Sequence, residues 1–138
     1  MIVGVPKEIK NKENRVGMVI AGVMAMVKNG HTVLVQKDAG LGAGISNEAY
    51  QGAGAHIIDT PEEIFAKAEM IIKVKEPLPE EYKLLRPGQI LYTYLHLAAD
   101  ERLTKAMMEQ GIIGIAYETI QPADGSLPLL SPMSAVAG

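Results

Sequence analysis

The amino-acid sequence predicts an α/β protein with a mostly parallel sheet and helices on both faces of that sheet. Short apolar segments alternate with helical segments six times, at intervals of roughly 20 to 30 residues, which is the rhythm of β-α-β units. The apolar segments are rich in β-branched or aromatic residues and are bounded by Gly or Pro, as strands are. No internal repeat or low-complexity tract interrupts this pattern.

Length and composition indicate one folded domain. The chain has 138 residues, of which 48% are hydrophobic, and its mean hydropathy is +0.12. No apolar run approaches the roughly 20 residues of a membrane span, the N-terminus lacks the order of a signal peptide, and there is no cysteine. We therefore expect a cytoplasmic protein without disulfides, with no membrane partner and no metal site.

The charge distribution argues against nucleic-acid binding. The net charge is −3, from 16 acidic and 13 basic residues, and the basic residues are scattered rather than gathered in a stripe. Five Tyr and one Phe leave few aromatic surfaces on which bases could stack. We expect no nucleic-acid partner.

The first half of the chain predicts three strands and three helices. The strands are expected at Ile2–Val5, His31–Gln36 and Ala55–Asp59, and the helices at Ile20–Asn29, from Ser46 to near Gly54, and from Thr60 to about Lys67. Gly30 is a normal helix stop. Thr60 as N-cap, Pro61 at the first helical position and Glu63 form the signature of a helix start. His56 enters its strand at the amino end, so we expect a structural role for it.

The second half predicts three further strands before the pattern changes. The strands are expected at Met70–Val74, Gln89–Leu95 and Ile112–Tyr117, and the helices over Glu80–Leu85 and from Asp100 through Gln110. After Glu118, Asp124-Gly125 is typical of a tight hairpin. Ser131 and Pro132 then indicate the first turn of a new helix, which is begun when the sequence ends at Gly138.

Two polar residues directly follow strands and suggest a pocket. Lys75 follows the Met70 strand and His96 follows the Gln89 strand, and ligands of open α/β sheets bind beyond the carboxyl ends of the strands. The alternatives are that Lys75 is a solvated strand end and that His96, between two leucines, is a core histidine. Arg15 lies in the charge-rich segment 6–16, which forms either an exposed loop or a cover folded back over the strand ends.

A glycine-rich turn follows the second strand. Gly40, Gly42 and Gly44 give the pattern G-x-G-x-G, but Ile45 stands where a dinucleotide-binding turn requires glycine. We therefore predict a flexible surface loop here, and not a cofactor site.

Six blocks occur in an order that carries a family resemblance. They are Gly4–Glu8, Glu13–Val16, Lys73–Pro77, Tyr94–Ala98, Ala116–Thr119 and Leu127–Ser134. Together they resemble the alanine dehydrogenase family and, more loosely, the related nicotinamide nucleotide transhydrogenase α subunit. The likeness covers the whole chain but only the first part of such an enzyme. It implies a flavodoxin-like or Rossmann-like substrate domain over residues 1–130, which a C-terminal segment returns to complete. Residues 131–138 would start the helix that leads to an NAD-binding domain.

The resemblance also implies an activity: NAD-dependent oxidative deamination of L-alanine to pyruvate and ammonia, and the reverse reaction. Arg15 and Lys75 would hold the carboxylate and the keto oxygen, and His96 would be the acid/base, roles that suit these residue types. Met133 and Ser134 would lie where the nicotinamide cofactor approaches. A second acid would come from beyond residue 138. The family implies a homo-oligomer, a hexamer.

The sequence departs from the family at residues 17–20, where Ala-x-Thr-Pro is usual and Gly17-Met18-Val19-Ile20 stands here. Loss of that Thr-Pro start weakens the cap of the helix at Ile20. Position 135 is Ala where an acidic residue is common. Two alternatives to the dehydrogenase remain, a transhydrogenase-like domain and a truncated non-catalytic domain. The Lys75 and His96 pair together with Arg15 favours the dehydrogenase, because a transhydrogenase needs no group that binds a carboxylate. The 138-residue chain alone is expected to be inactive, because it lacks the domain that would hold the cofactor.

Overall fold

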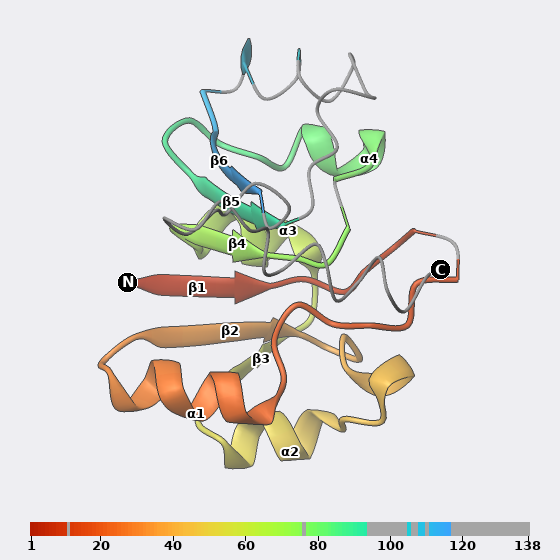
Figure 1. Ribbon diagram of the computed structural model, residues 1–138, viewed down its shortest axis with the longest axis vertical. Helices are drawn as coiled ribbons and strands as arrows, with labels where there is room; N and C mark the ends of the chain where they lie inside the picture. Colours follow the sequence, from red (N-terminus) through yellow and green to blue (C-terminus); the bar gives the residue numbers. More distant parts are fainter. Residues whose placement is uncertain (11, 76, 94–104, 106–107, 110, 117–138) are drawn as a thin grey trace, which may run out of the picture.

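The computed structural model describes residues 1–10, 12–75, 77–93, 105, 108–109 and 111–116 (Figure 1). Within them, six strands form one sheet in the order β3-β2-β1-β4-β5-β6, and every neighbouring pair is parallel. The strands are β1 (Ile2–Val5), β2 (Thr32–Gln36), β3 (His56–Ile58), β4 (Met70–Ile72), β5 (Ile90–Thr93) and β6 (Ile113–Ala116). The predicted parallel α/β sheet is confirmed.

Helices cover both faces of the sheet. α1 (Ile20–Lys28) and α2 (Asn47–Gly52) pack on β2 and β3, and α3 (Pro61–Lys67) packs on β1, β2 and β3 from the other side (Figure 1). Two core clusters separate the faces. Val33 and Val35 join the cluster under α1 and α2, whereas Leu34 between them joins the cluster under α3. Successive residues of a strand point to opposite faces, so a strand buried on both sides must be apolar throughout, as β2 is.

One glycine permits the close packing of α3 on the sheet. A Cβ atom at Gly4 of β1 would lie 2.8 Å from Ala68 Cβ and 2.8 Å from Ile64 Cγ2. Contacts this short are not tolerated between side chains, so a residue larger than glycine would push α3 away from β1.

Helix starts follow the predicted signals. Ser46 Oγ accepts a hydrogen bond from the N–H of Ala49 at the start of α2, and Thr60 Oγ1 accepts one from Glu63 at the start of α3. α1 begins after Val19, with no hydrogen bond from a capping side chain. The weak cap expected at Ile20 is therefore confirmed.

Several elements are shorter than predicted, among them β3, which lacks Ala55 and Asp59. β4 stops at Ile72 rather than Val74. The Lys73 N–H still donates to the Tyr92 carbonyl of β5, but the N–H groups of Val74 and Lys75 donate to the Glu8 side chain. α4 (Pro79–Tyr82) ends before Leu85. The helix predicted from Asp100 lies largely outside the described residues, and the hairpin and the helix predicted after Glu118 lie wholly outside them. In the described part of the chain, no helix combines the length and the apolar character needed to cross a membrane.

Candidate functional site

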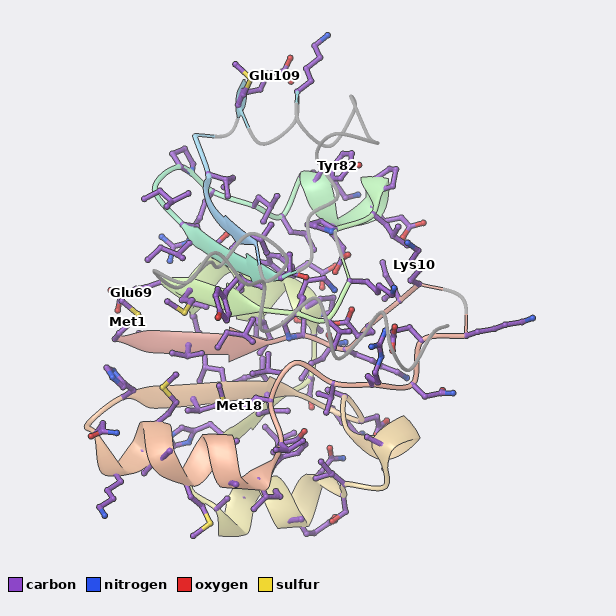
Figure 2. All side chains as sticks on the ribbon, viewed as in Figure 1. Met1, Lys10, Met18, Glu69, Tyr82 and Glu109 are labelled. Carbon is purple, nitrogen blue, oxygen red and sulfur yellow. The ribbon has the colours of Figure 1, made fainter. Side chains whose placement is uncertain are left out.

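The candidate site lies at the carboxyl ends of β1 and β4, where the strand order reverses. β1 pairs with β2 on one side and with β4 on the other, so the chain leaves these two neighbouring strands toward opposite halves of the sheet. A crevice at such a reversal is the usual ligand site of open parallel sheets. The segment after β1 carries Arg15 and the segment after β4 carries Lys75. Figure 2 shows Lys10 at this end of β1 and Met1 and Glu69 at the opposite end.

A small cavity of about 180 Å³ opens beside the carboxyl ends of β1 and β2. Its charged lining comes from both sides of the β1–β2 pair and consists of Lys7, Glu8, Glu13, Arg15 and Asp38. The glycine-rich loop forms another part of the wall through Leu41 and Gly42. The cavity is therefore small, polar and of mixed charge.

Glu13 holds Arg15 in a two-pronged contact. Arg15 Nε donates to Glu13 Oε2 at 2.9 Å and Nη2 donates to Oε1 at 2.7 Å, while the backbone N–H of Arg15 also donates to Oε2. These hydrogen bonds from Arg15 lower the pKa of Glu13 against the opposing effect of burial, and the positive charge of Lys75 lowers it further. Arg15 is half exposed at 49%, so Glu13 orients a guanidinium group that still reaches solvent.

Hydrogen bonds of its main chain hold Lys75 close to the residues that line this cavity. Its backbone N–H donates to Glu8 Oε1 at 3.0 Å, and Glu8 also lines the cavity beside Arg15. The Lys75 carbonyl accepts a hydrogen bond from Thr93 Oγ1 at 3.0 Å. Arg15 and Lys75 thus lie at the same end of the strands. Glu13 binds the Arg15 side chain, Glu8 binds the Lys75 N–H, and both glutamates line the same cavity.

A buried ionic cluster lies behind Lys75. Lys73 Nζ is 3.3 Å from Glu8 Oε1 and 3.3 Å from Glu81 Oε2, and the Lys73 side chain is only 1% exposed. Burial raises the pKa of Glu81, and the nearby Lys73 charge opposes this effect only in part. Two acids thus face one base in a region with little water.

Sequence reasoning missed this cluster, although one signal was present. A lysine inside the apolar run Met70–Val74 cannot be buried without a partner. The identity of that partner could not be predicted, because Glu8 lies in a segment 65 residues earlier.

The charge-rich segment after β1 is not merely an exposed loop. Pro6, Glu8 and Val16 are buried. A Cβ atom at Gly17 would lie 2.5 Å from the Ile72 carbonyl oxygen, so the chain passes directly against the end of β4. The alternative in which this segment folds back over the strand ends is therefore the correct one. Glycine at position 17 allows this close approach.

The glycine-rich loop is partly a surface loop, as predicted. Residues 41–44 are exposed, but Gly40 is buried against Tyr50, and a Cβ there would lie 2.7 Å from Tyr50 Cε2. A Cβ at Gly42 would lie 2.9 Å from the Asn14 carbonyl oxygen. The space that a dinucleotide pyrophosphate needs close to such glycines is taken by protein atoms, so this loop does not fit NAD.

Three predicted site residues, His96, Met133 and Ser134, lie outside the described residues. Their placement relative to Arg15 and Lys75 stays a prediction. Among the residues that the structure does describe, no three His, Asp or Glu side chains gather as metal ligands would.

Comparison with known proteins shows the family to which this chain is similar. A sequence model described as "Alanine dehydrogenase/PNT, N-terminal domain" matches residues 4–137. The chain is 60% identical over 138 residues to an alanine dehydrogenase of Methanococcus maripaludis, and the match covers 100% of this chain and 37% of that protein. The chain therefore spans little more than a third of that relative's length.

Two solved structures are similar as well. The structure titled L-alanine dehydrogenase has a TM-score of 0.96 and 49% identity, over 99% of this chain and 38% of that one. A transhydrogenase from Sinorhizobium meliloti has a TM-score of 0.82 and 28% identity, over 89% of this chain and 35% of its own. The sheet with its helices is thus the architecture found in both kinds of protein.

Proposed function

This chain belongs to the alanine dehydrogenase/PNT family as its N-terminal domain, and from that premise we propose that it is the substrate-binding part of an NAD-dependent L-alanine dehydrogenase. The reaction is the oxidative deamination of L-alanine to pyruvate and ammonia, and its reverse. One observation carries the proposal. Arg15 lines the small cavity at the carboxyl ends of β1 and β2, and Lys75, from the segment after β4, donates its N–H to Glu8 of the same cavity wall.

The two cations suit a 2-keto or 2-amino acid. A guanidinium group binds a carboxylate through two parallel hydrogen bonds, and Glu13 orients Arg15 for that role. The Lys75 ammonium would bind the keto oxygen of pyruvate and draw electron density from its carbon. His96 would transfer the proton near neutral pH.

The cofactor belongs mainly to another part of the protein. NAD, when bound, supplies or accepts the hydride. Of this chain's residues, we propose that Met133 and Ser134 face it, while the glycine-rich loop does not. On the same proposal, residues 1–130 form the substrate domain and residues 131–138 begin the helix toward the NAD-binding domain. The protein would act in the cytoplasm as a homo-oligomer, a hexamer.

The transhydrogenase alternative predicts a different role for the carboxyl ends of these strands. Hydride transfer between two nucleotides requires no site for a small carboxylate. Arg15 in the cavity wall, with Lys75 bound through its N–H to the neighbouring Glu8, therefore favours the dehydrogenase.

A chimaera tests the proposal directly. In it, residues 1–138 replace the segment they match in the Methanococcus maripaludis alanine dehydrogenase. We expect NADH oxidation that depends on both pyruvate and ammonia, and NAD reduction that depends on L-alanine. Hydride transfer between two nucleotides, without any dependence on pyruvate, would establish the transhydrogenase reading instead. A folded chimaera with neither activity would support the non-catalytic alternative.

A further inference from the structure

Lys75 is held at both of its main-chain polar groups by buried side chains. Its N–H donates to Glu8 Oε1 and its carbonyl accepts from Thr93 Oγ1, each at 3.0 Å. Glu8 Oε2 also accepts the N–H of Val74 at 3.2 Å. Glu8 and Thr93 are both buried. The last hydrogen bond to a neighbouring strand is therefore that from the Lys73 N–H to the Tyr92 carbonyl, and beyond it side chains from the two flanking segments bind Val74 and Lys75.

Glu8 is itself fixed in one orientation. Its carboxylate receives two N–H groups and lies 3.3 Å from Lys73 Nζ, whose second carboxylate neighbour is Glu81. Glu81 in turn accepts the N–H of Leu78 through Oε1 at 3.1 Å. The turn after β4 is thus bound to the buried cluster through Lys73, Val74, Lys75 and Leu78.

The cluster is poorly explained by stability alone. Buried ion pairs lose much of their attraction to desolvation, and apolar replacements of similar volume are often equally stable. Glu81 shows this directly, because burial raises its pKa despite the adjacent ammonium. What the charged cluster achieves, and apolar packing would not, is to point two carboxylate oxygens at the N–H groups of Val74 and Lys75.

We propose that Glu8 is a positioning residue for Lys75, and that Thr93 positions the same residue from the other side. This inference rests on the proposed function, in which Lys75 binds the keto oxygen of the substrate. Thr93 precedes His96 by three residues in the sequence, so its bond also ties together the two strand ends that carry Lys75 and His96. Neither Glu8 nor Thr93 need touch the substrate for this role.

The test measures pyruvate affinity in the chimaera by calorimetry with NAD present, so that inactive variants can be compared. Glu8→Gln keeps the side-chain volume but removes one acceptor oxygen and the charge facing Lys73. We expect the Kd of pyruvate to rise by about tenfold to hundredfold, the effect of misplacing a binding group by roughly 1 Å. The Kd of NADH should stay unchanged.

Thr93 supplies a second pair of variants, in case Glu8→Gln does not fold. Thr93→Val is nearly the same shape and lacks only the hydroxyl donor, so it should weaken pyruvate binding by a smaller factor, about threefold to tenfold, the worth of one ordinary hydrogen bond. Thr93→Ser restores a hydroxyl and should restore most of the affinity. A Thr93→Val variant that binds pyruvate like the parent would overturn the role of Thr93, and if Glu8→Gln also binds normally, the whole proposal.

Gln89 is a matched control for a purely structural effect. It is 2% exposed and donates two hydrogen bonds to backbone carbonyls, but it lies at the amino end of β5, away from the cavity. Gln89→Leu should lower the Tm and leave the Kd of pyruvate unchanged. If the Glu8 and Thr93 variants behave in the same way, their side chains serve only stability and the proposal is wrong.

A double-mutant cycle separates this inference from the proposed function. If Thr93 acts through Lys75, Thr93→Val should have no further effect on pyruvate affinity once Lys75→Ala is present. Equal effects in both backgrounds would overturn the inference. A Lys75→Ala variant that binds pyruvate normally would instead show that Lys75 is no substrate ligand, and would remove the proposed function itself.

Discussion

The amino end of β5 and the carboxyl ends of β1 and β4 both use side chains to bind main-chain groups, but the groups that predominate differ. At the amino end of β5, the side chains mainly donate and main-chain carbonyls accept. Gln89 Nε2 and the Arg86 guanidinium both donate to the carbonyls of Phe65 and Ala68, at the end of α3. These are carbonyls that a helix leaves without internal partners, and a cation there is favoured by the helix dipole.

At the carboxyl ends of β1 and β4, carboxylates accept hydrogen bonds from main-chain N–H groups, and the Thr93 hydroxyl donates one to the Lys75 carbonyl. Glu8 accepts the N–H groups of Val74 and Lys75, and Glu13 accepts that of Arg15. The connections also differ in length. Residues 68–69 join α3 to β4 at the amino end, whereas residues 6–19 join β1 to α1 at the carboxyl end. The short connection 68–69 turns the chain directly into β4, whereas the long connection 6–19 carries cations that line a cavity. We therefore expect changes at the first end to affect stability alone.

The largest effect is expected at His96, which the sequence places at the carboxyl end of β5. In the chimaera, His96→Gln should lower kcat by about two orders of magnitude or more, the usual contribution of a positioned proton-transfer group. The Tm should change little, and the limb of the pH–rate profile that reports this group should disappear. A variant that melts much earlier but keeps its rate and pH profile would make His96 a core histidine.

Arg15→Lys should give the next largest effect. It keeps the charge but loses the two-pronged geometry that Glu13 orients, a loss of roughly 1.5–3 kcal/mol for a charge-assisted contact. Titration calorimetry should show weaker pyruvate binding and unchanged NADH binding. A parallel loss of both affinities would mean that Arg15 serves folding of the segment 6–16, and the contrast between the two sheet ends would not hold there.

At the amino end, Arg86→Met should act on stability only. It removes hydrogen bonds to the carbonyls of Phe65 and Ala68 and should cost about 1–3 kcal/mol of unfolding free energy. Chemical denaturation of the chimaera measures this loss, and the pyruvate affinity of the folded variant should equal that of the parent. A weakened affinity would show that the two ends of the sheet are coupled.

The smallest effect concerns pH and distinguishes two acids at the carboxyl end. The pKa of Glu81 is raised in the folded chain, so its contribution to stability falls as pH rises above the unfolded value of about 4.5. The pKa of Glu13 is lowered, so its contribution is present above 4.5 and is lost as pH falls through the lower folded value.

Between about pH 3 and pH 7, a window that extends below the unfolded carboxyl value so that it includes the loss of the Glu13 contribution, Glu81→Gln should therefore make the Tm rise more steeply with pH than in the parent. Glu13→Gln should make it rise less steeply. Thermal melts at several pH values measure both slopes, and equal slopes for the two variants would contradict the opposite directions assigned here.

Much of the fold could be predicted because its signals are local. The cap at Thr60, the stop at Gly30 and the apolar segments each need only a few neighbouring residues to be recognised. The order of the strands could not be read in this way, since β1 pairs with β4 across more than sixty residues of chain. The early end of β4 has the same cause, because its N–H groups bind Glu8.

The predicted site comprised Arg15, Lys75 and His96, with Met133 and Ser134 at the cofactor, and the structure adds what holds the two cations. Lys75 and Arg15 were found by their positions after strands and by family resemblance. Glu8 and Glu13 could not be predicted as the partners of these cations, because an acid in a charge-rich segment has the same sequence pattern whether it is buried or solvated. The glycine-rich loop shows the reverse problem. Its glycines allow close packing on Asn14 and Tyr50, which no local pattern distinguishes from flexibility.

The bond between Glu8 and Val74 joins residues 66 positions apart, and this separation has a consequence for the order of folding. Contacts distant in sequence form late, because the entropy of closing a long loop is lost before the contact contributes any stabilising energy. Three charged groups must also leave water together for the cluster to form. We expect refolding to pair β1 with β2 first and to dock β4 afterwards. In pulse-labelling hydrogen exchange, the amides of Val74 and Lys75 should therefore become protected after those of Val33 and Val35, and simultaneous protection would show that sheet and site form in one step.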